Sequence, residues 1–159
     1  MKLKSISEIR KKAVAGLKEG DTFSVKRKFT KKPTESFGDI TKDYNPVHYD
    51  TRFTEAKNLK GLICHGLLVA SLITEIGGQI GWLASGMDFH FKKPVYFGDT
   101  ITCSFTIIEI NERGKARGEA VYSNQDDVVV LEAILTGIVP GSKERRVLKI
   151  LMEEDDSAS

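Results

Sequence analysis

The longest periodic apolar stretch of the chain reads His65-Gly-Leu-Leu-Val-Ala-Ser-Leu-Ile-Thr-Glu-Ile-Gly-Gly-Gln-Ile80. Apolar residues recur here at the spacing of an α-helix and cover a broad stripe, namely Leu67, Leu68, Val69, Leu72, Ile73, Ile76 and Ile80. Gly66 stands near the beginning, and Gly77, Gly78 and Gly81 mark the far end. We therefore predict one long central helix over residues 65–80. Its polar interruptions are typical of a buried helix and not of a membrane span.

The sequence after this helix is rich in β-branched and aromatic residues. It predicts strands over Met87–Phe91, Thr100–Ile110, Lys115–Ser123 and Val128–Ile138, separated by short Gly, Asn and Asp breaks. One further strand is predicted before the helix, over residues 22–29. Long strands joined by short turns form an antiparallel meander. The expected fold class is α+β, with a sheet wrapped around one helix.

The remaining segments divide the chain into three parts. Residues 1–20 form a basic lead-in with an amphipathic helix from Ser5 to about Leu17, and residues 21–140 form the main domain. Within that domain we expect a helix over residues 30–43 and a single helical turn over residues 51–56. Residues 141–159 form a tail whose last six or so residues we expect to be disordered. A length of 159 residues suits one such domain with one site.

Composition excludes several functional classes. Hydrophobic residues make up 40% and charged residues 29%, with a net charge of +2, so neither a nucleic-acid partner nor a membrane protein is expected. Cys64 and Cys103 lie in apolar runs, which is typical of reduced core cysteines in the cytoplasm. We find no spacing of metal ligands, no phosphate-binding glycine loop and no G-x-S-x-G element, so no metal and no cofactor are predicted.

Asp43 and His48 are the strongest candidates for chemistry. They flank Tyr44-Asn45-Pro46, and Pro46 disfavours helical geometry at Asn45, so the chain turns between them. Such a turn can direct a carboxylate and an imidazole at one water molecule, which is what adding water across a double bond requires. The alternative stays open that Asp43 only caps a local turn and that His48 is half-packed.

A second candidate feature is the start of the central helix at His65-Gly66. Free N–H groups there can polarise a carbonyl, and glycine allows close backbone approach, although a glycine needed only for tight packing fits equally well. His90 alternates with Phe89 and Phe91 on a strand, so we expect a structural role for it. Ser71 taken alone has no claim on function.

Three blocks in order resemble the MaoC-like dehydratases, the (R)-specific enoyl-CoA hydratases. They are residues 37–48 (Phe-Gly-Asp-Ile-Thr-Lys-Asp-Tyr-Asn-Pro-Val-His), residues 61–71 (Gly-Leu-Ile-Cys-His-Gly-Leu-Leu-Val-Ala-Ser) and residues 91–100 (Phe-Lys-Lys-Pro-Val-Tyr-Phe-Gly-Asp-Thr). The resemblance covers roughly residues 20–140. It implies a hotdog fold, a homodimer or higher homo-oligomer, and an acyl-CoA or other acyl-thioester substrate.

The resemblance also implies roles for individual residues. Asp43 and His48 would activate water, Gly66 would supply the carbonyl-binding N–H, and Asn45 and Ser71 would support the pair. The implied reaction is reversible syn hydration of a trans-2-enoyl thioester to the (R)-3-hydroxyacyl product. A hotdog thioesterase and a non-catalytic acyl-thioester binding module are the alternatives. The chain departs from the family pattern at Lys42, where glycine usually precedes the aspartate.

Overall fold

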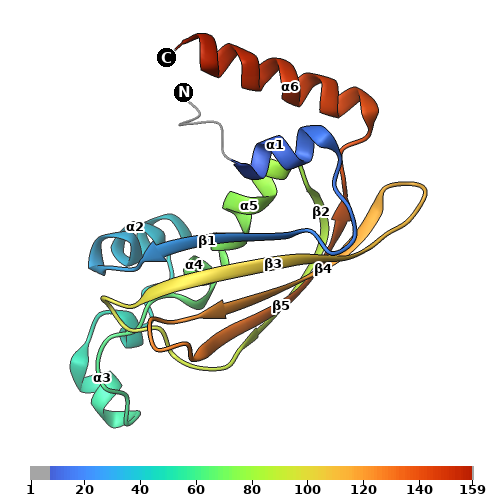
Figure 1. The fold of residues 1–159 in the computed structure, drawn as a ribbon. Coiled ribbons are helices and arrows are strands. Elements are labelled where there is room, and N and C mark those ends of the chain that lie inside the picture. Colours follow the sequence, from blue (N-terminus) through green and yellow to red (C-terminus); the bar gives the residue numbers. More distant parts are fainter. Residues whose placement is uncertain (1–7, 159) are drawn as a thin grey trace.

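Five antiparallel strands form one curved sheet in the order β1-β3-β4-β5-β2 (Figure 1). The computed structural model describes residues 8–158. The strands are β1 (Thr22–Lys28), β2 (Leu83–Phe91), β3 (Thr100–Ile110), β4 (Lys115–Ser123) and β5 (Val129–Ile138). The expected α+β hotdog architecture is confirmed. Strand β2 begins four residues earlier than the predicted Met87, and a register irregularity lies between Ala84 and Gly86.

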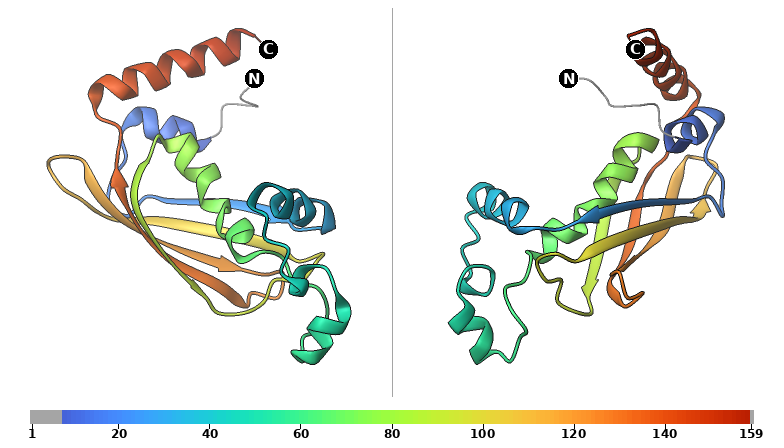
Figure 2. Two further views of the ribbon diagram at one scale, coloured as in Figure 1. Left: turned by 180° about the vertical axis from the view of Figure 1, so that it is seen from behind. Right: turned by 60° about the vertical axis from the view of Figure 1, so that its left-hand side comes forward.

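The predicted central helix is present but divided in two. Helix α4 (Gly66–Ala70) and helix α5 (Leu72–Ile80) lie against the concave face of the sheet (Figure 2). The prediction of one continuous helix over residues 65–80 was wrong. At the joint, the Ser71 hydroxyl donates to the Leu68 carbonyl at 2.5 Å, and such bonding of serine to a preceding turn bends helices. Leu67 of α4, which was expected in the buried stripe, is 59% exposed.

The sheet and the two helices share one hydrophobic core. Alternate residues of β3 and β5 point at the helices, where Ile76 and Ile80 of α5 are fully buried. Tyr122 of β4 is also fully buried, and its hydroxyl donates to the Ala70 carbonyl at 2.7 Å. This bond ties the sheet to the end of α4. Burial raises the pKa of Tyr122, so it remains a neutral donor.

Two helices outside the main domain lie together at one end of the molecule (Figures 1 and 2). They are α1 (Glu8–Ala15) and α6 (Ser142–Ser157). Arg145 of α6 donates to the Ala15 carbonyl at 3.2 Å, and Leu148 packs against the core. The expected disorder of the last residues is therefore contradicted up to Ser157, because an amphipathic helix continues through them. The lead-in over residues 1–7 lies outside the described part.

The segment between β1 and α4 forms the opposite end of the molecule (Figure 1). It contains α2 (Lys31–Thr41), the 3-10 turn η1 (Pro46–His48) and α3 (Thr51–Ala56), which match the predicted helix and helical turn. Cys64, which follows this segment, and Cys103 of β3 are buried free thiols, as predicted. Among residues 8–158, no helix is both long enough and apolar enough to cross a bilayer.

Candidate active site

The turn after α2 fixes the orientation of Asp43. Asp43 Oδ1 accepts a hydrogen bond from the Asn45 N–H at 3.2 Å, and Asn45 Oδ1 accepts from the Val47 N–H at 3.2 Å at the start of η1. Asp43 thus caps a local turn through one oxygen, and its second oxygen, Oδ2, lies nearer the histidines. The capping bond is therefore present and orients the carboxylate, and the catalytic role of Asp43 stays a prediction.

Lys42 explains why glycine is usual before this aspartate. As the C-cap of α2, Lys42 adopts a left-handed conformation with φ 62°, and its N–H donates to the Gly38 carbonyl at 2.7 Å. A side chain in this conformation costs about 1–2 kcal/mol, which glycine avoids. Lys42 in place of the usual glycine therefore raises the conformational free energy of the backbone in this turn.

We predict that Lys42→Gly stabilises the protein. Relief of strain is offset by about 0.4–1 kcal/mol of extra chain entropy in the unfolded state, so the net gain is about 1 kcal/mol or less. Lys57 is the matched control, because it caps α3 with an ordinary φ of −93°. Chemical denaturation should show Lys57→Gly destabilised and Lys42→Gly stabilised. A loss of stability in both variants would contradict the assignment of strain to residue 42.

His48 presents one free ring nitrogen. The residue is 7% exposed, and its Nδ1 donates to the Ile63 carbonyl at 2.8 Å. A carbonyl only accepts, so this bond places the proton on Nδ1 and leaves Nε2 with a lone pair. Burial lowers the pKa of His48, and the bond to Ile63 opposes that shift. Neutral His48 therefore offers Nε2 as a base near pH 7.

The carboxylate and the imidazole are separated by a gap of the size that a water molecule bridges. Asp43 Oδ2 lies 3.8 Å from His48 Nε2, which is too long for a direct hydrogen bond. The Asp43 side chain is 50% exposed, whereas that of His48 is 8% exposed. The pair thus combines a solvent-accessible acid with a buried base, as general acid–base chemistry on water requires.

An apolar cavity of about 310 Å³ opens beside His48. Its wall combines residues from η1, α4, the end of β2 and β5, namely His48, Ile63, Cys64, Gly66, Val69, Phe91, Lys92, Lys93, Pro94, Val95, Val130 and Leu131. Burial raises the pKa of the Cys64 thiol to about 11, so Cys64 is no nucleophile near neutral pH.

Gly66 lies in the cavity wall at the start of α4. A Cβ atom at this position would come within 2.7 Å of the Phe91 ring, so glycine is required for the close packing of Phe91. The N–H groups of the first helical turn have no acceptor within the helix. The structure thus supports the packing role of Gly66, and the carbonyl-binding role of its N–H stays a prediction.

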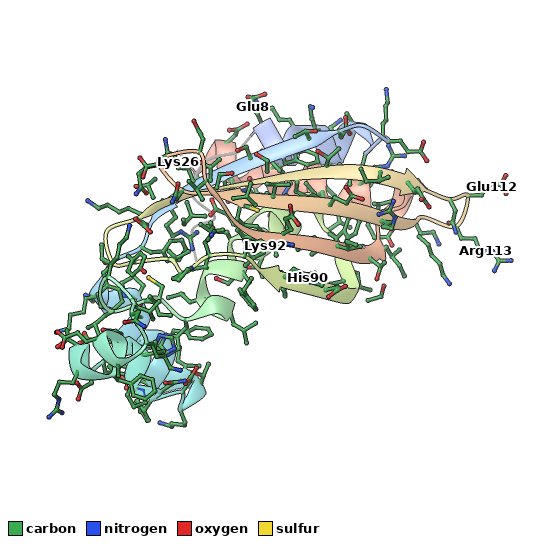
Figure 3. All side chains as sticks on the ribbon, turned by 90° about the horizontal axis from the view of Figure 1, so that it is seen from below. Glu8, Lys26, His90, Lys92, Glu112 and Arg113 are labelled. Atoms are coloured by element: carbon green, nitrogen blue, oxygen red, sulfur yellow. The ribbon has the colours of Figure 1, made fainter. Side chains whose placement is uncertain are left out.

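Two predicted residues do not join the site. Ser71 is absent from the cavity wall, and its hydroxyl is bonded within the helix, so the structure gives no basis for a supporting role. His90 lies on the far face of the sheet, exposed and 3.1 Å from Asp88 (Figure 3). His90 is therefore not part of the site, and its described polar contact is the ion pair with Asp88 on the outer face.

His65 is the site residue that the sequence motif did not identify as functional. It is 1% exposed, and its ring stacks on His48 with centroids 3.8 Å apart. Its Nε2 donates to the main-chain carbonyl of Asp43 at 2.9 Å. In the sequence, His65 stood only as the residue before Gly66 at the start of the central helix, and its burial and its bond to Asp43 come from the tertiary structure.

The same three side chains form a possible metal-ligand group, which spacing alone did not predict. Ligand atoms of Asp43, His48 and His65 lie within 4.8 Å of one another. His65 Nε2, however, donates to the Asp43 carbonyl, so its proton occupies the nitrogen that would bind the metal. The arrangement fits acid–base chemistry better than metal binding.

Comparisons with known proteins agree with this geometry. The model of the MaoC-like domain family matches residues 13–129. A mitochondrial 3-hydroxyacyl-(acyl-carrier-protein) dehydratase of Arabidopsis thaliana is 26% identical over 144 residues, which cover 87% of this chain and 86% of that protein. The (R)-specific enoyl-CoA hydratase of Aeromonas caviae is 29% identical over 100 residues, covering 60% of this chain and 75% of that protein. A solved structure of the (R)-hydratase from A. caviae superimposes with a TM-score of 0.74 at 25% identity, covering 79% of this chain and 98% of that one.

Proposed function

Because the chain belongs to the MaoC-like domain family, we propose that it catalyses reversible syn addition of water to a trans-2-enoyl thioester, giving the (R)-3-hydroxyacyl thioester. The observation that carries this proposal is the pairing of Asp43 with His48 beside an apolar cavity. The names of the related hydratases and dehydratases support the same reaction class.

In this reaction Asp43 and His48 together accept one proton from water and donate one proton to the substrate. A water held between Asp43 Oδ2 and His48 Nε2 loses a proton to one partner while its oxygen bonds to the β-carbon. The electron pair of the double bond passes toward the thioester oxygen, and the α-carbon then receives a proton from the pair. Both new bonds form on the face of the substrate that meets Asp43 and His48, which explains a syn outcome.

The thioester oxygen needs a donor while it carries negative charge. We assign this role to the N–H of Gly66, which stands in the wall of the cavity next to His48. The apolar wall formed by Val69, Val130 and Leu131 suits the acyl chain.

Coenzyme A carries phosphate groups, and binding them calls for basic side chains near the opening of the cavity. Lys92 and Lys93 lie in its wall, and Lys93 with Pro94 also borders a neighbouring outer hollow of about 780 Å³ that contains Lys60. Lys92 forms an ion pair with Glu132 at 3.3 Å, which makes Lys93 and Lys60 the better phosphate partners. Lys57 does not line either hollow.

The deciding experiment is turnover of crotonyl-CoA by the whole chain. We expect loss of enoyl absorbance and formation of the (R)-3-hydroxy product, without release of free thiol. Thiol release would instead show a thioesterase, and binding of the substrate without turnover would show a binding module. A panel of thioesters on CoA and on acyl-carrier protein, differing in chain length, then defines the substrate.

We further propose a homodimer formed through strand β2. Among residues 8–158 this strand pairs only with β5, and it exposes Leu83, Met87 and Phe91 at the edge of the sheet. An exposed apolar edge strand is a template for pairing with a second copy. Light scattering should give twice the chain mass of 17.7 kDa for the wild type and a monomer for Met87→Lys. A monomeric wild type would overturn the dimer without affecting the proposed reaction.

A cytoplasmic location stays a prediction, which fractionation of the source cells tests.

A further inference from the structure

His65 occupies an unusual place beside the active site. His65 is 1% exposed and is absent from the cavity wall, which contains its neighbours Cys64 and Gly66, so its imidazole is covered by protein and is not open to a substrate. It lies behind the acid–base pair, where its ring stacks on His48 at 3.8 Å and contacts the ring of Phe37 in a tilted arrangement, at 5.1 Å and 56°. A buried polar ring in this position needs a reason, because it costs desolvation free energy without binding substrate.

The hydrogen bonds of His65 fix its protonation state. Nε2 must carry a proton, because its partner is the main-chain carbonyl of Asp43 at 2.9 Å. Nδ1 is buried and has no hydrogen-bond partner, so a second proton there would leave an unsatisfied N–H that costs about 1–3 kcal/mol. The bond to the Asp43 carbonyl therefore requires the proton of His65 to be on Nε2.

His48 has the opposite assignment. Its Nδ1 donates to Ile63, and its Nε2 is free. The two rings lie nearly parallel, at 28°, so the plane of one restricts the plane of the other. Only His48 can act as a base toward the cavity, and His65 can act only as a donor to the backbone of Asp43.

We propose that His65 is a positioning residue, which holds the main chain of Asp43 through Nε2–H and the plane of His48 through the stack, so that both partners converge on one water. The proposal rests on the function proposed above. Apart from this bond, the hydrogen bonds of Asp43 among the described residues are local ones within its own turn. Its half-exposed carboxylate lies 3.8 Å from His48 Nε2 and 3.9 Å from His65 Nε2, which is too far for a direct hydrogen bond to either ring. A displacement of about 1 Å at a reacting group can cost about a hundredfold in rate, so such an anchor is needed.

Two substitutions separate the donor from the volume of the ring. His65→Gln retains an amide N–H that reaches about as far as Nε2, whereas His65→Leu retains the volume and removes the donor. In crotonyl-CoA hydration, we expect the leucine variant to lose about 10- to 100-fold in kcat with little change in KM, because His65 does not line the cavity. The glutamine variant should stay within about tenfold of the wild type. Equal losses in both variants, or a loss in KM alone, would overturn the proposal.

A double-mutant cycle distinguishes positioning from general destabilisation. In an Asp43→Asn background the carboxylate that His65 holds in place is already absent. The additional loss caused by His65→Leu should therefore shrink to about threefold or less, whereas unrelated structural damage would be additive. The same fold-loss in both backgrounds would show that His65 does not act through Asp43.

The protonation states give a test that needs no substrate and no variant. Nitrogen NMR shifts should show His65 as the Nε2–H form and His48 as the Nδ1–H form in the wild type from pH 7 to 8. The reverse assignment at His65 would overturn the proposal even if the leucine variant does not fold. If the wild type fails to hydrate any enoyl thioester, the proposed function falls and the catalytic role of His65 falls with it, while the NMR result still decides whether His65 donates from Nε2 to the backbone of Asp43.

Discussion

Asp43→Asn should abolish most enoyl-thioester hydration while leaving the fold intact. The asparagine carbonyl can still accept the hydrogen bond from the Asn45 N–H, so the turn before η1 keeps its anchor. What disappears is the negative charge and the proton affinity of the oxygen that lies 3.8 Å from His48 Nε2. Loss of one positioned acid–base group lowers the rate by about 10²–10⁴-fold, and we expect kcat for crotonyl-CoA to fall by at least about a hundredfold.

Asp39→Asn is the matched control for this variant. Asp39 lies on α2, four residues before Asp43, and its nearest polar contact is the Tyr44 hydroxyl at 3.2 Å. The same chemical change there should leave kcat unchanged. Stopped-flow absorbance gives the rates, and thermal unfolding should place Asp43→Asn within about 0.5 kcal/mol of the wild type, as for most surface changes. Near wild-type turnover by Asp43→Asn would remove the catalytic pair from the proposal.

The sequence predicted the sheet well because its strands are long and regular. From Thr100 to Ile138 the alternation of apolar residues is nearly unbroken, and the breaks fall at residues that favour turns. Strand β2 was predicted too short, because Leu83-Ala-Ser-Gly lacks the β-branched residues that indicate a strand. Pairing with β5 extends it, and pairing is a tertiary effect that a local pattern does not contain.

Helix geometry was predicted less well for a similar reason. The apolar period continues across Ser71, and nothing in that period reveals the hydroxyl bond that bends the chain there. The acidic end of α6 also lacks the apolar residues that predict packing. The helix is nevertheless stabilised from its other half, where Arg145 and Leu148 contact α1 and the core.

The candidate site shows the same division between local and tertiary information. Asp43, Asn45 and His48 were predicted because one short turn contains them all. The stack of His48 on His65 joins residues 17 positions apart, and it depends on where α4 begins relative to η1. Sequence spacing alone does not fix that relation, so the motif drew attention to Gly66 and left its neighbour His65 without a role.

His48→Gln should produce a loss of similar size to Asp43→Asn and should also change the response to pH. Glutamine at this position has no lone pair of comparable basicity, so kcat should fall by at least about a hundredfold. In the wild type, burial lowers the pKa of His48 below its ordinary value of 6.5, so the base form persists through neutral pH. Wild-type kcat/KM should therefore be level near pH 7 and fall only below pH 6.5, and the variant should lack this acid limb.

The same pKa shift has a consequence for stability, with a definite sign. Below pH 6.5 the unfolded chain binds a proton at residue 48 more readily than the folded protein does, so wild-type stability falls as the pH is lowered. Denaturation at pH 5 and pH 7 should show a smaller fall for His48→Gln. His90→Gln is the matched control, because His90 is exposed on the far face of the sheet. This variant should change neither kcat nor the fall of kcat/KM at acid pH. If the fall of kcat/KM at acid pH survives in His48→Gln, another group must cause it. His48 would then not be the base of the proposed reaction.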